Sequence, residues 1–71
     1  MKIDGKKMNR LRERKLLTVR EFCSACQISQ RTWLKASKGE NLRVTTVRKI
    51  CTVLEVSPEE IELQEGNANE Q

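Results

Sequence analysis

The sequence predicts a compact, all-α domain of five short helices, and three observations support this prediction. Helix-forming Leu, Arg, Lys and Glu are abundant, whereas the 71 residues include only 3 Gly and 1 Pro. Apolar residues recur at helical spacing in several stretches, and helix-capping signatures separate those stretches. We place one domain at residues 1–63, and we expect residues 64–71 to form a disordered acidic tail.

A first helix is expected over residues 5–15, after a short lead at residues 1–4 in which Asp4 is a candidate N-cap. Met8 and Leu11 give this helix a narrow apolar stripe. The residues around the stripe are basic: Lys6, Lys7, Arg10, Arg12, Arg14 and Lys15. Some of these cations are expected to meet phosphate, and a solvated face is the alternative.

Two further helices, joined by a tight turn, are expected within residues 18–39. Thr18 and Glu21 have the T-x-x-E spacing of a capping box, in which each side chain caps the other residue's backbone N–H. Ser29 is a second N-cap candidate. Gly39 is suited to a left-handed cap at the end of the second helix of this pair.

The second helix of this pair has two different faces. Trp33 and Ala36 are expected to be buried. The opposite face contains no acidic residue and consists of Gln30, Arg31, Leu34, Lys35 and Lys38. Two short amphipathic helices of this kind, the second with a cationic and amide-bearing outer face, indicate a helix-turn-helix that reads DNA.

The last two helices follow a polar connector at residues 40–43. Val44, Val47, Ile50, Cys51 and Leu54 recur at helical spacing and predict a fourth helix. A short fifth helix should begin after Ser57, with Pro58 at its first position and Glu60 completing a capping box, and should run to about Leu63.

Charge is distributed unevenly along the chain. Residues 1–50 contain all 14 basic residues and 4 acidic ones, a net charge of +10, whereas residues 51–71 contain 6 Glu and no basic residue. This asymmetry indicates a polyanionic partner. No apolar run approaches the length of a membrane span and no signal-peptide pattern is present, so we expect a cytoplasmic protein.

The residue types argue against catalysis, metal binding and a disulfide framework. The sequence has no His, no Tyr and 3 Cys, an odd number. Cys23 and Cys26 have CxxC spacing but fall on the predicted inner face of a helix, so buried thiols are expected in place of a zinc or redox site. No enzyme constellation, cofactor or small-molecule substrate is predicted.

The pattern as a whole resembles the lambda-repressor-like, Cro/XRE-type helix-turn-helix proteins over about residues 6–63. The matching pieces are Met8-x-x-Leu11-Arg12, Leu17-Thr18-x-x-Glu21-Phe22-Cys23, Ile28-Ser29-x-x-Thr32-Trp33, Lys38-Gly39 and Lys49-Ile50-Cys51-x-x-Leu54-x-Val56-Ser57-Pro58-Glu59. The resemblance implies a compact five-helix regulator of a bacterium, phage or mobile element, often a homodimer. In a chain this short, dimerisation would be weak and would use the fifth helix or form on DNA.

Several residues depart from the family pattern. The usual glutamine after the cap of the second helix is Val19, so its phosphate contact would pass to backbone N–H groups or to Arg20. Family members often pair the arginine at position 12 with an acid at position 37. Here that position is Ser37, which would leave Arg12 free for phosphate or another partner.

These residues predict how double-stranded DNA would be bound. Thr18 and the first turn after it, with backbone N–H groups, would position phosphate, and Ser29 would add a DNA contact to its cap. Gln30 is suited to adenine and Arg31 to guanine. Leu34 would cover a thymine methyl group or pack against protein. Base edges or backbone would be contacted by Lys35, Lys38, Asn41 and Arg43.

A second hypothesis is a protein-binding helix-turn-helix module, such as an antitoxin or an adaptor. The acidic residues within 55–71 and the outward-facing Leu34 support it. Co-purification of a partner, with binding unaffected by alanine at Gln30 and Arg31, would favour this hypothesis over DNA reading.

Overall fold

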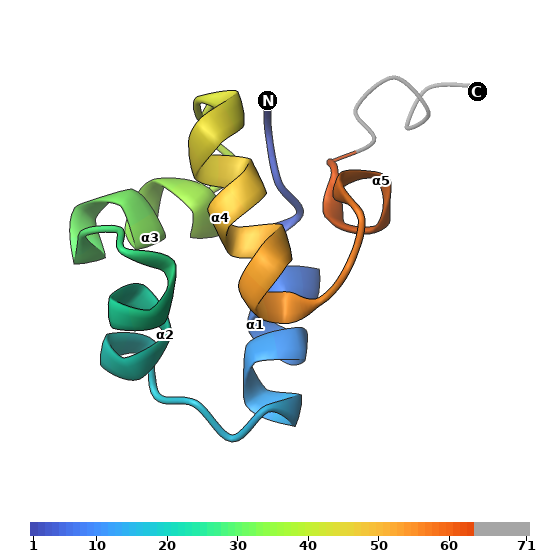
Figure 1. Cartoon of the computed structure of the whole chain (residues 1–71). Helices are drawn as coiled ribbons and strands as arrows, with labels where there is room; N and C mark the ends of the chain where they lie inside the picture. The colour runs from blue at the N-terminus through green and yellow to red at the C-terminus, as the bar shows by residue number, and fades with distance from the viewer. Residues whose placement is uncertain (64–71) are drawn as a thin grey trace.

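The computed structural model describes residues 1–63, which fold into five helices (Figure 1). The helices are α1 (Gly5–Arg14), α2 (Val19–Cys26), α3 (Gln30–Ser37), α4 (Val44–Leu54) and α5 (Pro58–Ile61). The prediction of an all-α, five-helix fold is confirmed. The predicted disordered tail at residues 64–71 lies outside the described residues.

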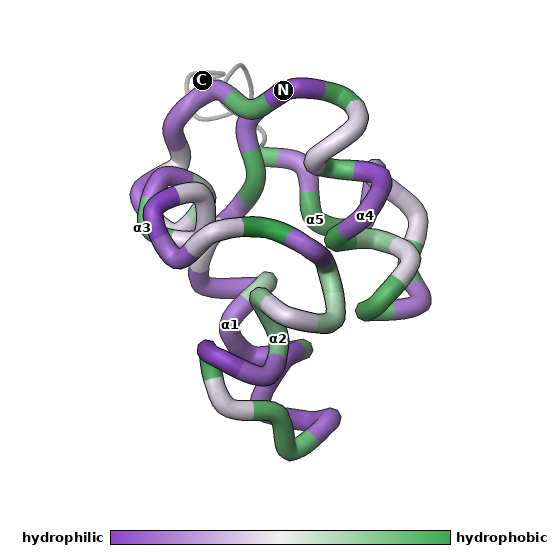
Figure 2. Tube along the Cα trace, turned by 60° about the vertical axis from the view of Figure 1, so that its left-hand side comes forward, coloured by the Kyte–Doolittle hydropathy of each residue, from purple (hydrophilic) through white to green (hydrophobic). Residues whose placement is uncertain are grey.

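The core lies where α2 meets both α3 and α4 and where α1 meets α3. Its fully buried side chains include Met8, Phe22 and Ile50. Trp33 is also buried, and its ring meets that of Phe22 edge to face, with centroids 5.4 Å apart and planes at 72°. Figure 2 shows that α1, by contrast, is largely hydrophilic along its length. The helices therefore enclose a small aliphatic core that contains one aromatic pair.

The predicted N-terminal caps of the first and last helices, α1 and α5, are present. The Asp4 carboxylate accepts hydrogen bonds from the backbone N–H groups of Lys6 and Lys7, at 3.1 and 3.3 Å. It thereby caps the N-terminus of α1. At α5, the Glu60 carboxylate accepts from the backbone N–H and the hydroxyl of Ser57, both at 3.2 Å. The fifth helix ends at Ile61, two residues before the predicted boundary.

Residues 1–4 precede the first helix, as the sequence suggested, but they also pack into the core and pair with distant parts of the chain, which the sequence did not indicate. Ile3 is fully buried in the core. The segment pairs with two distant parts of the chain: the Leu42 N–H donates to the Met1 carbonyl at 2.6 Å, and the Leu63 N–H donates to the Lys2 carbonyl at 2.9 Å. The N-terminal segment thus joins the end of the domain to the loop before α4.

None of the helices in residues 1–63 has the length and apolar character needed to cross a membrane.

Candidate nucleic-acid interface

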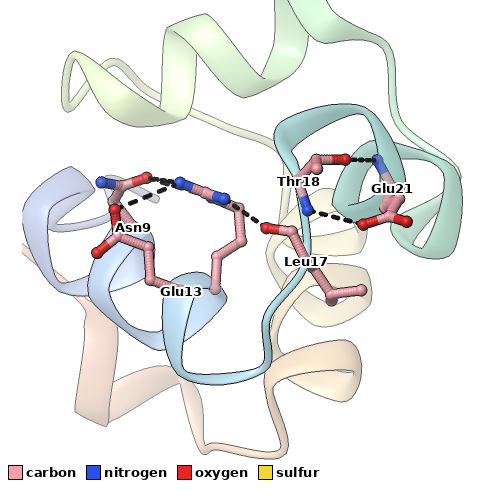
Figure 3. A network of polar contacts seen from close by, with 6 residues as sticks. Asn9, Glu13, Leu17, Thr18 and Glu21 are labelled. Carbon is pink, nitrogen blue, oxygen red and sulfur yellow. Dashed lines mark hydrogen bonds and ion pairs between the residues drawn. The ribbon is translucent and has the colours of Figure 1, made fainter.

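The start of α2 is built by the predicted capping box. The Glu21 N–H donates to the Thr18 hydroxyl at 3.1 Å, and the Thr18 N–H donates to the Glu21 carboxylate at 2.9 Å (Figure 3). The predicted reciprocal cap is confirmed. Thr18 and Arg20 are both exposed at this end of the helix, where backbone N–H groups give a positive potential.

The turn between α2 and α3 is closed without glycine. Gln27 has φ 60° and ψ 45°, the left-handed conformation that favours glycine. The following N–H, of Ile28, donates to the Cys23 carbonyl at 3.0 Å, which is the Schellman hydrogen bond that ends a helix. Ile28 also packs against the core. This tight turn and the Phe22–Trp33 ring contact fix the angle between the two helices.

The first turn of α3 is capped by Ser29. Its hydroxyl accepts from the Thr32 N–H at 3.1 Å and lies 3.0 Å from the Thr32 hydroxyl. Ser29 is nevertheless exposed. The predicted cap is confirmed.

The outer face of α3 brings together the five residues predicted for it. Trp33 and Ala36 are buried beneath, and 54% of the Leu34 side chain is exposed. The exposed residues of this recognition face are Gln30, Arg31, Leu34, Lys35 and Lys38. Within residues 1–63 the three cations of this face make no ion pair. The face therefore combines unneutralised positive charge with one amide and one exposed aliphatic side chain.

Two predicted contact residues flank α3 on its C-terminal side. Arg43 is exposed and stands at the N-cap of α4, where no side chain caps the backbone N–H groups. Asn41 is exposed too, but its side-chain oxygen accepts a hydrogen bond from the Met1 amino group at 2.8 Å. Asn41 therefore has a structural contact that the sequence did not indicate.

Arg12 is engaged within the domain, so of its two expected roles, phosphate or another partner, the structure shows the second. Its Nε and Nη2 donate to the Asn9 side-chain oxygen at 3.2 and 2.7 Å, and its Nη1 donates to the Leu17 carbonyl (Figure 3). Its Cζ lies 5.6 Å from the centre of the Trp33 ring, a cation–π contact, and only 13% of its side chain is exposed. Arg12 thus connects α1, the loop before Thr18 and α3.

Asn9 is the residue of this network that the sequence analysis missed. It stands three residues before Arg12 on the same helix, a spacing that brings side chains together. That spacing was the available signal. Position 37 carries serine where family members often have an acid, which suggested an unpaired Arg12. In the structure an amide, a backbone carbonyl and an aromatic ring contact Arg12, and the Glu13 carboxylate lies 3.7 Å from its Nη2.

The three cysteines are free and buried, and for Cys23 and Cys26 the burial was predicted. Burial raises the pKa of the Cys26 thiol to about 12, and the neighbouring Cys23 adds to the shift. Burial also raises the pKa values of Cys23 and Cys51. The thiols are therefore neutral near pH 7, which makes them poor nucleophiles. In the described part of the chain, no three His, Cys, Asp or Glu residues are grouped so as to hold a metal ion.

The chain was compared with known protein families. A model of the Cro/C1-type helix-turn-helix (HTH) DNA-binding domain matches residues 7–62, which include all five helices except the first two residues of α1. Searches of curated proteins and of solved structures found no match to the chain.

Proposed function

The chain belongs to the Cro/C1-type helix-turn-helix DNA-binding domain family, and on that premise we propose that it is a sequence-specific transcriptional regulator that inserts α3 into the major groove. The recognition face of α3 is the observation that carries the proposal. Its charged and amide groups are exposed and unneutralised within residues 1–63, while the opposite side of the same helix is fixed in the core by Trp33. A bacterium, a phage or a mobile element is the expected source.

Phosphate contacts would set the position of the domain on the duplex. The capped starts of α2 and α3, at Thr18 and Ser29, present backbone N–H groups, and exposed Arg20 and Arg43 add cations. Asn41 would use its amide nitrogen, because its oxygen is bound to the Met1 amino group. Each neutralised phosphate releases counterions, so affinity would fall steeply as salt is raised.

Base contacts would come from the first two turns of α3. Gln30 is suited to a bidentate contact with adenine and Arg31 to a bidentate contact with guanine. Leu34, one turn further on, would cover a thymine methyl group, which gives an exposed aliphatic side chain a use. Lys35 and Lys38 would meet base edges or the backbone at the end of the helix.

Selection of bound duplexes from a random DNA pool, at low and at high salt, tests this proposal. We expect a sequence motif and retention that weakens with salt. A palindromic motif with half-sites one turn apart, ~34 Å, would indicate a weak homodimer on DNA. Absence of both a motif and salt-dependent retention would contradict the proposal.

Replacing Arg31 by alanine tests the base-reading role directly. We expect affinity for the selected duplex to fall by ~1–3 kcal/mol and the preference at one base pair to relax. Arg14→Ala is the matched control, because it removes the same charge from an exposed position on α1. An equal loss on selected and random duplexes would assign Arg31 to phosphate.

A second candidate function is a protein-binding module such as an antitoxin or an adaptor. The exposed Leu34 at the centre of the recognition face favours it, since a leucine there suits a protein surface as well as a thymine methyl group. A co-purifying partner whose binding is weakened by Leu34→Ala, but unaffected by alanine at Gln30 and Arg31, would support this function over DNA reading.

A further inference from the structure

A second cationic surface lies on α1, a different helix from the recognition face. Lys7, Arg10 and Arg14 are spaced three and four residues apart and line a depression of about 300 Å³ together with Leu11 of the same helix and Glu60 of α5. We call this depression the α1–α5 groove. In Figure 1, α1 and α5 lie to the right of α2 and α3. The groove thus lies on α1 and α5, whereas the recognition face lies on α3.

The three cations of the groove have no partner within residues 1–63. They are exposed, and the ion pairs of neighbouring basic residues are those of Arg12 with Glu13 and of Lys15 with Glu55. Glu60 shares the groove but makes no ion pair with these three cations within residues 1–63, and its carboxylate accepts hydrogen bonds from Ser57. Like charges one helical turn apart repel each other, so a bound anion would relieve an unfavourable interaction.

The floor of the groove is apolar. Leu11 is partly buried and packs against the core between the flanking cations. An aliphatic side chain of a partner would remove this surface from water, and carboxylates beside it would meet the Arg10 and Arg14 guanidinium groups as two-pronged hydrogen-bond acceptors. Clusters of arginine are a recurring means of recognising acidic peptides.

We propose that the α1–α5 groove binds an acidic peptide segment of a partner protein, in which an aliphatic side chain stands among Asp or Glu residues. A DNA backbone fits this groove less well, because it has no aliphatic group for Leu11. The proposal does not depend on DNA binding, and it provides a surface through which a DNA-bound domain holds a second protein.

Peptide binding to the full chain tests the proposal. The probe is a short fluorescein-labelled peptide of glutamates interrupted by two leucines, and a peptide of glutamates alone with the same length is its control. Binding is followed by fluorescence anisotropy, and a labelled random-sequence duplex at low salt is measured in parallel. We expect the leucine-containing peptide to bind more tightly than the control and to bind equally well when the duplex is present.

Two matched triple variants locate the site. The groove variant Lys7→Glu/Arg10→Glu/Arg14→Glu is expected to weaken peptide binding about tenfold or more, with a much smaller effect on the duplex. The recognition-face variant Arg31→Glu/Lys35→Glu/Lys38→Glu makes the same change in charge and is expected to leave peptide binding within twofold. Glutamine at the three groove positions replaces glutamate if circular dichroism shows that the first variant is unfolded.

Three results would overturn the proposal. Equal loss of peptide binding in both triple variants would indicate general attraction between opposite charges. Loss of duplex binding without loss of peptide binding in the groove variant would make the groove a DNA-backbone contact. Equal binding of the two peptides would remove the role of Leu11. A domain that fails to bind any duplex leaves the peptide measurement intact, so failure of DNA binding is recognised separately.

Discussion

The helix-turn-helix α2–α3 and the N-terminal segment 1–4 are held in the domain by contacts of different range. In α2–α3, the capping box, the turn at Gln27 and the Phe22–Trp33 ring contact join residues that are close in the sequence. In the N-terminal segment, the Met1 amino group donates a hydrogen bond to the side chain of Asn41, 40 residues away. The backbones of Ile3 and Glu62 form an isolated antiparallel β-bridge. The contacts of α2–α3 can be inferred from residues close in the sequence, whereas those of residues 1–4 can be recognised only in the folded structure.

Removal of Trp33 should have the largest effect on the local region. Trp33→Ala deletes the only tryptophan of the core together with its contacts to Phe22 and Arg12. We expect a loss of ~3–5 kcal/mol in the free energy of unfolding, which would unfold a domain of this size. Thermal unfolding followed by circular dichroism measures it.

The adjacent Leu34 is the control for Trp33, because it lies on the same helix and is half exposed. Leu34→Ala should change the free energy of unfolding by less than ~0.5 kcal/mol. Similar melting temperatures for the two variants would show that α3 is not anchored through Trp33.

Removal of Ile3 tests whether the N-terminal segment belongs to the same cooperative unit. Ile3 is fully buried, so Ile3→Ala should cost ~2–5 kcal/mol and lower the unfolding midpoint of the whole domain. Urea unfolding monitored by Trp33 fluorescence and by circular dichroism would give coincident transitions. Ile28→Ala, at a partly buried position, is the control and should cost less. A Trp33 signal unaffected by Ile3→Ala would mean that the segment docks independently.

The elements that the sequence predicted correctly depend on local signals. The caps at Asp4, Thr18 and Ser29 and the burial of Trp33 follow from residue types at fixed spacing. The pairing of residues 1–4 with residues 41–42 and 61–63 gives no such signal in the sequence, because a segment of four residues is too short to show a hydrophobic period. The placement of Ile3 in the core therefore became visible only in the folded domain.

For the candidate site, the exposure of the residues could be predicted from the sequence, but some of their contacts within the domain could not. All ten residues proposed for DNA contacts are exposed, since the 3.6-residue period separates the faces of α3 and the caps locate the helix starts. The engagement of Arg12 and Asn41 was not predictable from family pattern alone. In both cases the partner is a group that the pattern does not specify: the Asn9 amide and the Leu17 carbonyl for Arg12, and the Met1 amino group for Asn41.

Arg12 contacts residues that are close in the sequence, Asn9 and Leu17, and also the more distant Trp33. Its removal should lower the free energy of unfolding by an intermediate amount. Arg12→Ala leaves the Asn9 oxygen and the Leu17 carbonyl without their donor and uncovers the Trp33 ring. We expect a loss of ~1–3 kcal/mol in the free energy of unfolding, measured by urea denaturation. Arg12→Lys should recover only part of it, because an ammonium group lacks the planar fork that reaches both acceptors.

A double-mutant cycle separates the ring contact of Arg12 from its hydrogen bonds. Combining Arg12→Ala with Trp33→Leu, which removes the aromatic ring, should reveal a coupling of ~0.5–1 kcal/mol, the size of a cation–π contact. Arg10→Ala, at an exposed position of the same helix, is the control. Additive effects of the two substitutions would show that the guanidinium group is held by its hydrogen bonds alone.

The smallest expected change in the free energy of unfolding is at Gln27, in the turn between α2 and α3, and this change stabilises the domain. Gln27 has φ 60°, a conformation that costs ~1–2 kcal/mol in a residue with a side chain. Gln27→Gly removes that cost but gives the unfolded chain more freedom, worth ~0.5–1 kcal/mol, so we expect a net stabilisation of ~0.5–1 kcal/mol. Gln27→Ala keeps the strain and is the control in the same thermal unfolding measurement. A lower melting temperature for Gln27→Gly than for Gln27→Ala would mean that chain entropy, and not backbone strain, dominates this turn.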